Sequence, residues 1–121
     1  MSKRTLVLGA SPNPERYAFK ATIMLSEHNH PVFPVGLRTG NIEGLSILTK
    51  TPKIEDIDTL TLYVGPKNQP FYYNYILNDI KPKRIIFNPG TENEELVKMA
   101  QKKGIQTEEA CTLVLLSIGN Y

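Results

Sequence analysis

The chain has 121 residues, enough for one domain, residues 1–121, that buries a single hydrophobic core. Its 14 lysine and arginine residues against 12 acidic residues give a net charge of +2, which is too small to indicate a nucleic-acid or membrane partner. A single cysteine, Cys111, excludes an internal disulfide and fits a reducing compartment. The N-terminus shows no apolar run of signal-peptide length, so we expect a cytoplasmic protein.

Short apolar runs alternate along the chain with longer amphipathic segments, a pattern typical of strands that alternate with helices. The apolar runs predict strands at residues 5–9, 32–35, 59–64, 84–87 and 105–107. The amphipathic segments predict helices at residues 14–29, 68–80 and 91–104. Residues 36–53 are predicted to be a long loop with at most one short strand or turn at 45–48. Residues 107–118 fit a helix or a mixed structure equally well.

Two of these helices carry recognisable start signals. Asn13 is predicted to cap the first helix, with Pro14 at its first position. Thr91 and Glu94 are spaced as a capping box for the third. The alternation as a whole predicts an α/β fold: a doubly wound, Rossmann-like, three-layer arrangement with a mostly parallel sheet of about five strands and helices on both faces.

In open parallel sheets, ligands bind outside the carboxyl ends of the strands. Three loops are expected to meet there, at residues 9–13, 36–38 and 65–68. Two of them lead into helix N-termini, whose free N–H groups attract phosphate. In the first loop, Gly9 would let the backbone approach a ligand and Ser11 would add a hydroxyl donor. The loop is neither G-x-G-x-x-G nor a P-loop, so a plain strand–helix turn is the alternative.

The loop after the second strand carries Arg38. Proteins that bind NAD usually have a carboxylate in this region for the 2′-hydroxyl of the ribose, but here none occurs before Glu43. An arginine suits an additional phosphate on the adenosine ribose, either the 2′-phosphate of NADP or the 3′-phosphate of coenzyme A (CoA). The alternative is an arginine that is only solvated at the surface.

Four segments, Gly9-Ala10-Ser11, residues 33–38, Ile42-Glu43-Gly44 and residues 63–67, together resemble a known family. It is that of the small single-domain CoA-binding proteins, similar to the CoA-binding domain of the succinyl-CoA synthetase α subunit. The resemblance extends through Cys111 and implies a Rossmann-like fold with CoA or acyl-CoA as the ligand. The chain departs from the family at Gly36-Leu37, where the family usually has Asn-Pro.

The resemblance also implies where CoA would lie. The pyrophosphate would rest on the N-terminus of the first helix, held by Gly9, Ala10, Ser11 and Asn13. Arg38, in the loop that begins at Val35, would bind the 3′-phosphate. The adenosine or pantetheine would be bordered by Val64, Gly65, Pro66 and Lys67.

No residue is assigned a catalytic role, and we do not expect a self-contained enzyme. Cys111 is predicted to be buried and structural, and His28 and His30 have no third ligand at metal spacing. The aromatic residues of segment 71–75 are predicted to pack in the core and on a partner surface. Two alternatives stay open: an NADP-binding oxidoreductase-like domain, although no helical Tyr-x-x-x-Lys pair occurs, and a ligand-free interaction scaffold. A homo-oligomer or a protein partner is compatible with both.

Overall fold

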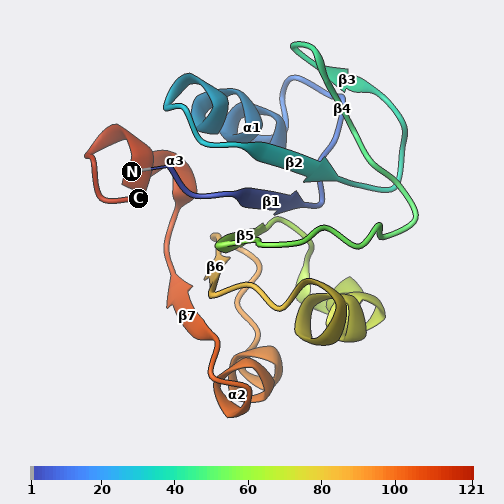
Figure 1. Ribbon diagram of the computed structural model, residues 1–121, viewed down its shortest axis with the longest axis vertical. Helices are drawn as coiled ribbons and strands as arrows, with labels where there is room; N and C mark the ends of the chain where they lie inside the picture. Colours follow the sequence, from blue (N-terminus) through green and yellow to red (C-terminus); the bar gives the residue numbers. More distant parts are fainter. Residues whose placement is uncertain (1) are drawn as a thin grey trace.

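The computed structural model describes residues 2–121, and its centre is a five-stranded sheet in which every neighbouring pair is parallel (Figure 1). The strand order is β2-β1-β5-β6-β7. The strands are β1 (Thr5–Leu8), β2 (Val32–Val35), β5 (Thr59–Leu62), β6 (Arg84–Phe87) and β7 (Gln106–Glu109). The predicted α/β, Rossmann-like fold is therefore confirmed, and the last strand is shifted by one to two residues from its predicted position.

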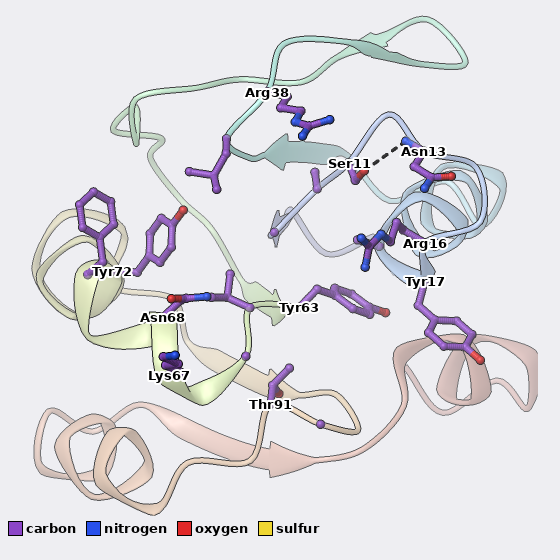
Figure 2. A pocket seen from close by; sticks show the side chains of 18 of the residues that line it. Ser11, Asn13, Arg16, Tyr17, Arg38, Tyr63, Lys67, Asn68, Tyr72 and Thr91 are labelled. Carbon is purple, nitrogen blue, oxygen red and sulfur yellow. Dashed lines mark hydrogen bonds between the residues drawn. The ribbon is translucent and has the colours of Figure 1, made fainter.

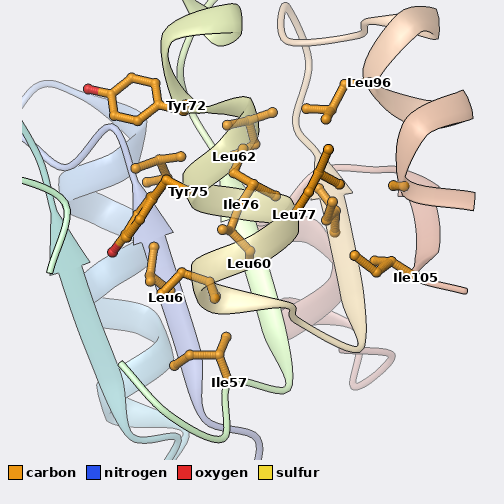
Figure 3. Close-up of a cluster of buried hydrophobic side chains, with 14 of the residues drawn as sticks. Leu6, Ile57, Leu60, Leu62, Tyr72, Tyr75, Ile76, Leu77, Leu96 and Ile105 are labelled. Atoms are coloured by element: carbon orange, nitrogen blue, oxygen red, sulfur yellow. The ribbon is translucent and has the colours of Figure 1, made fainter. Parts of the chain in front are cut away.

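Helical segments cover both faces of this sheet. They are α1 (Tyr17–Glu27), the 3₁₀ helix η1 (Pro66–Tyr72), the π-helix η2 (Tyr75–Ile80), α2 (Glu94–Lys102) and α3 (Thr112–Ser117). Because side chains alternate along a strand, Val7 packs with α1 and α3 on one face, while Leu6 and Leu8 pack with η2 and α2 on the other (Figure 3). None of the helices in residues 2–121 has the length and apolar character needed to cross a membrane.

Helix α1 begins at Tyr17, so the prediction that Asn13 caps it at Pro14 is wrong. Asn13 instead closes a short turn: its side-chain oxygen accepts from the Glu15 N–H at 3.0 Å and its carbonyl from the Arg16 N–H at 3.1 Å. Arg16 then adopts an extended conformation (φ −77°, ψ 142°) and becomes the N-cap. Local hydrogen bonding of an asparagine side chain thus competes with helix continuation and delays the helix by three residues.

The predicted capping box of α2 is also wrong, because the N-cap is Asn93. Its Oδ1 accepts from the N–H groups of Glu95 and Leu96 at 3.1 and 3.4 Å. The Thr91 hydroxyl instead donates to the carbonyl of Asn88 at 2.7 Å. Thr91 and Asn93 are both residue types that cap helices well. Because the Thr91 hydroxyl bonds to Asn88, Asn93 is the residue that caps α2.

The segment predicted as one helix at residues 68–80 is η1 followed by η2. Pro70 lies inside η1, where it lacks the N–H of a regular helix and its ring crowds the preceding turn, so an α-helix is excluded there. Lys81, in the left-handed region at φ +48°, ends η2 by donating its N–H to the Ile76 carbonyl at 3.0 Å.

The long loop after β2 contains two short antiparallel strands rather than the single strand or turn predicted. They are β3 (Asn41–Ile42) and β4 (Leu45–Ser46). The segment returns to β2, where the Gly36 N–H donates to the Leu48 carbonyl at 2.9 Å and the Leu48 N–H to the Pro34 carbonyl at 2.8 Å. The hairpin is therefore attached beside the end of β2.

The strand order places the topological switch point between β1 and β5. The chain leaves β1 for α1 on one face and leaves β5 for η1 on the other. Loops that diverge in this way leave a crevice between them, which is where ligands bind in such sheets.

Candidate functional site

A cavity of about 960 Å³ lies at the switch point, at the carboxyl ends of β1, β5 and β6 (Figure 2). This volume is at the upper end of the range of roughly 300–1,000 Å³ that ligand pockets occupy. It is lined by Gly9, Ala10, Ser11, Pro12, Asn13, Arg16, Tyr17, Ala18, Leu37, Arg38, Tyr63, Val64, Gly65, Lys67, Asn68, Phe71, Tyr72, Pro89, Gly90 and Thr91.

Most residues predicted for the site meet around this cavity. Those that line it are Gly9, Ala10, Ser11, Asn13, Arg38, Val64, Gly65 and Lys67. Val35 instead lines an adjacent cavity of about 580 Å³. Pro66 lines neither and begins η1. The three predicted loops therefore do converge on one cavity.

Gly9 and Ala10 have a structural role in this loop. Their N–H groups both donate to the Val35 carbonyl, at 2.9 and 3.0 Å, so neither N–H is free for a phosphate. A Cβ on Gly9 would stand 2.9 Å from the Tyr63 carbonyl carbon, and the residue has φ +99°. The close approach of the loop after β1 to Tyr63 therefore requires a glycine at this position.

The first turn of α1 supplies the free N–H groups at this end of the cavity. Within residues 2–121, the N–H groups of Tyr17, Ala18 and Phe19 make no hydrogen bond, and the first two of these residues line the cavity. Arg16, immediately before them, also lines the cavity and was not among the predicted site residues. A helix N-terminus with an adjacent arginine is a favourable place for an anion.

All charged side chains that line the cavity are cationic: Arg16, Arg38 and Lys67. They come from three different segments, the end of the loop after β1, the loop after β2 and the start of η1, and Figure 2 shows them around the cavity. In the part of the chain that the structure describes, the only ion pair is Arg84–Glu108, so none of the three is neutralised by a carboxylate. The cavity therefore favours an anionic ligand.

A fourth loop, Pro89-Gly90-Thr91 after β6, completes the cavity. Only three loops were predicted at this edge, and this one was missed. The same rule that selected the others, that the carboxyl ends of parallel strands share one edge, would have found it.

The buried side chain of Gln69 connects the two loops that follow β5 and β6. Its Nε2 donates to the carbonyls of Val64, at 2.9 Å, and Thr91, at 2.7 Å. Its Oε1 accepts from Asn93 Nδ2 at 2.8 Å, and Asn93 in turn caps α2. Gln69 is 0% exposed, and its bond to the Thr91 carbonyl is buried. One amide thus fixes the relative position of Val64 and Thr91 on the cavity wall.

Gly36 is the point of closest approach between the loops after β1 and β2. A Cβ at this position would stand 2.2 Å from the carbonyl oxygen of Ala10. A Cβ on Gly65, by contrast, would meet no atom within 4 Å. Gly36 and Gly65 therefore differ in what an added methyl group would meet.

We expect Gly36→Ala to destabilise the fold by about 2–3 kcal/mol, because the methyl group pushes against backbone that cannot move independently. Gly65→Ala is the matched control and should change the free energy of unfolding by less than about 0.5 kcal/mol. Urea denaturation of both variants measures this difference. Equal stability of the two variants would contradict the close approach at Gly36.

The sequence also singled out Cys111, the metal-binding side chains and the aromatic segment 71–75. Cys111, predicted to be buried, is half-buried at the N-cap of α3 and does not line the cavity. No three metal-binding side chains of residues 2–121 gather around a common point. Tyr72 and Tyr75 are buried in the core, as predicted, whereas Phe71 is exposed and lines the cavity.

Tyr63 presents its ring to the cavity, but its hydroxyl is buried and makes no hydrogen bond. Burial raises the pKa of this phenol above its ordinary value, so it is protonated at neutral pH. Tyr63 therefore contributes an apolar surface to the cavity.

The comparisons with known proteins agree with this geometry. A solved structure of an uncharacterised protein is 50% identical and has a TM-score of 0.96, with 100% of this chain and 99% of that one covered. A hypothetical protein from Pyrococcus horikoshii OT3 is 29% identical with a TM-score of 0.79, covering 93% and 80% of the two chains. A Thermus thermophilus protein, 20% identical with a TM-score of 0.84 and coverage of 98% and 91%, shares the fold.

No curated protein matches the chain. The model of one protein family, described as the CoA binding domain, matches residues 3–117. That match spans all five strands of the sheet and all four loops of the cavity. The chain therefore belongs to the CoA binding domain family.

Proposed function

We propose that this cleft binds CoA or an acyl-CoA, and that the protein acts as a binding domain without self-contained catalytic machinery. The observation that carries the proposal is the set of three cations around one cavity beside the free N–H groups of α1. CoA is a matching ligand because it carries a pyrophosphate and a separate 3′-phosphate.

The proposal places the pyrophosphate at the first turn of α1, with Arg16 beside it and Ser11 at the rim. Arg38 binds the 3′-phosphate across the cavity, and Lys67 adds a cation on the loop after β5. These groups bind and orient anions, and no described residue lining the cavity is a carboxylate, an imidazole or a thiol. We therefore assign binding roles and no catalytic role.

The test is a thermal-shift and calorimetric comparison of CoA, acetyl-CoA, NADP, NAD and ATP. CoA at about 100 times its Kd should stabilise the protein by about 2.7 kcal/mol, whereas NAD and ATP, which lack the 3′-phosphate, should stabilise it less at the same concentration. Arg16→Glu should abolish the CoA effect because it places a carboxylate beside the pyrophosphate.

Lys98→Glu is the matched control, because it changes the net charge equally at an exposed position of α2 outside the cavity. It should leave CoA binding unchanged. A selective response to NADP would favour the oxidoreductase-like alternative, and no response to any of the five ligands would favour the interaction scaffold.

A further inference from the structure

The amino ends of the strands carry a cluster of polar side chains that the proposed function does not use. The cluster lies at the opposite edge of the sheet from the cavity, because Thr5, Thr59 and Arg84 are the first residues of β1, β5 and β6. Figure 1 shows the first and last segments of the chain together at this edge. They are in direct contact, since Lys3 Nζ donates to the Tyr121 carbonyl at 2.7 Å.

Tyr121 covers a buried positive charge. The guanidinium carbon of Arg84 lies 4.7 Å from the centroid of the Tyr121 ring, and the Arg84 side chain is only 10% exposed. Its Nη1 pairs with Glu108 at 3.3 Å, whereas its Nη2 is buried and has no hydrogen-bond partner in the described structure. The Tyr121 hydroxyl lies 2.6 Å from Thr5 Oγ1. The Thr5 hydroxyl donates to the Lys3 carbonyl, so the tyrosine is the donor in this pair. The ring therefore shields Arg84 from water at this edge.

His30 connects Tyr121 to the first residues of the chain. Its Nδ1 accepts a hydrogen bond from the Lys3 N–H at 2.9 Å, which is possible only while Nδ1 carries no proton. The His30 and Tyr121 rings also meet edge to face, with centroids 4.9 Å apart and an interplanar angle of 61°. The backbone of His30 is held at the end of α1, where its N–H donates to the Leu25 carbonyl at 3.1 Å. A proton on Nδ1 would therefore replace this hydrogen bond with a contact between two donors.

We propose that His30 is the pH-sensitive element of a clasp formed by Lys3, His30 and Tyr121. The clasp is closed over Arg84 while the imidazole is neutral, and it opens when the imidazole is protonated. Protonation removes the acceptor of the Lys3 N–H and adds a third positive charge to the two, Lys3 and Arg84, that already lie against the Tyr121 ring. Tyr121 then leaves the edge of the sheet, and Arg84 becomes accessible to solvent.

The surroundings of His30 favour the closed clasp at neutral pH. Burial lowers the pKa of the imidazole below its ordinary value of 6.5, and the charges of His28, Lys3 and Arg84 lower it further. Tyr121 is uncharged, because burial raises its pKa. No described carboxylate forms an ion pair with His30. The unfolded chain therefore binds this proton more readily than the folded one, so the stability that His30 contributes above its ordinary pKa is lost as the pH falls below 6.5.

An NMR titration of the wild type from about pH 8 to about pH 5 tests the clasp. The Lys3 amide and the Tyr121 ring protons should shift together with the His30 imidazole, with one midpoint below 6.5. Hydrogen exchange of the Lys3 amide, corrected for the intrinsic pH dependence of exchange, should become about ten-fold faster once His30 is protonated.

Three variants separate His30 from other titrating groups. His30→Asn keeps an acceptor oxygen at the position of Nδ1 but cannot take up a proton, so Tyr121 and Lys3 should keep their neutral-pH signals throughout. His30→Lys is charged and has no acceptor, so it should show the open state already at neutral pH. His28→Asn is the matched control, at the exposed C-cap of α1. It should retain the transition at a slightly higher pH, because one neighbouring positive charge is removed.

Circular dichroism checks that each variant is folded. The clasp is refuted if His30 titrates while the signals of Lys3 and Tyr121 stay constant, or if its midpoint lies at or above 6.5. Persistence of the transition in His30→Asn, or its loss in His28→Asn, would assign the effect to another group and would also refute the clasp. No residue of the clasp lines the cavity, so the result does not depend on whether the protein binds CoA.

Discussion

Replacing Gln69 by leucine is expected to lower the free energy of unfolding by about 3–4 kcal/mol. The change removes both hydrogen-bond donors and the acceptor of a fully buried amide. The carbonyls of Val64 and Thr91 lose their hydrogen-bond donor. The leucine side chain that takes its place cannot donate to them. A carbonyl left unpaired in the interior costs more than the bond itself contributes.

Gln101→Leu is the matched control for this substitution. Gln101 is exposed on α2 and makes only one long hydrogen bond, at 3.3 Å to the Thr107 hydroxyl. Its replacement should change stability by less than about 0.5 kcal/mol. Denaturant unfolding curves of the two variants and the wild type give both values. Similar stabilities for the two variants would show that Gln69 does not hold the loops together.

For ligand binding, the largest effect is expected from the 3′-phosphate. The wild type should bind CoA roughly ten- to a hundred-fold more tightly than dephospho-CoA, because in the proposed function Arg38 binds the 3′-phosphate that only CoA carries. Arg38→Ala should remove this preference and leave the affinity for dephospho-CoA nearly unchanged. Added salt should reduce the preference of the wild type, since Arg38 is exposed and its interaction is screened.

Arg16→Ala provides the contrast within the same cavity. Arg16 lies at the N-terminus of α1, where the pyrophosphate is proposed to bind, and both ligands carry a pyrophosphate. This variant should therefore weaken CoA and dephospho-CoA by the same factor. Calorimetry of the two ligands against the three proteins gives the full comparison. Equal affinities of the wild type for CoA and dephospho-CoA would exclude Arg38 as the phosphate ligand.

The parallel sheet and the meeting of the three loops could be predicted because they follow from a simple periodicity. Buried runs such as residues 5–8 and 59–62 are apolar enough to be strands, and glycines shortly after them mark their ends. The parallel pairing of the strands then places the loops that follow them at one edge of the sheet. None of these steps depends on the conformation of a single side chain.

The helix starts could not be predicted because they depend on competing hydrogen bonds of similar strength. Asn13 and Thr91 are both good caps, but Asn13 bonds within its own turn and Thr91 bonds back to Asn88. The surroundings of Gly9 and Phe71 could not be predicted for a related reason. Whether a glycine faces a ligand or a neighbouring strand, and which ring of an aromatic cluster faces outward, depends on tertiary contacts.

The position of β1 in the sheet determines when the crevice between β1 and β5 forms during folding. Thr5 is aligned with Val32 on one side and with Thr59 on the other, so the first strand has no hydrogen-bonded neighbour close to it in sequence. Parallel pairing of distant segments is slow, because a long loop must close before any contact compensates for the lost entropy. The crevice between β1 and β5 therefore forms only after the chain has extended past residue 62, and only then does the loop after β1 gain its facing wall.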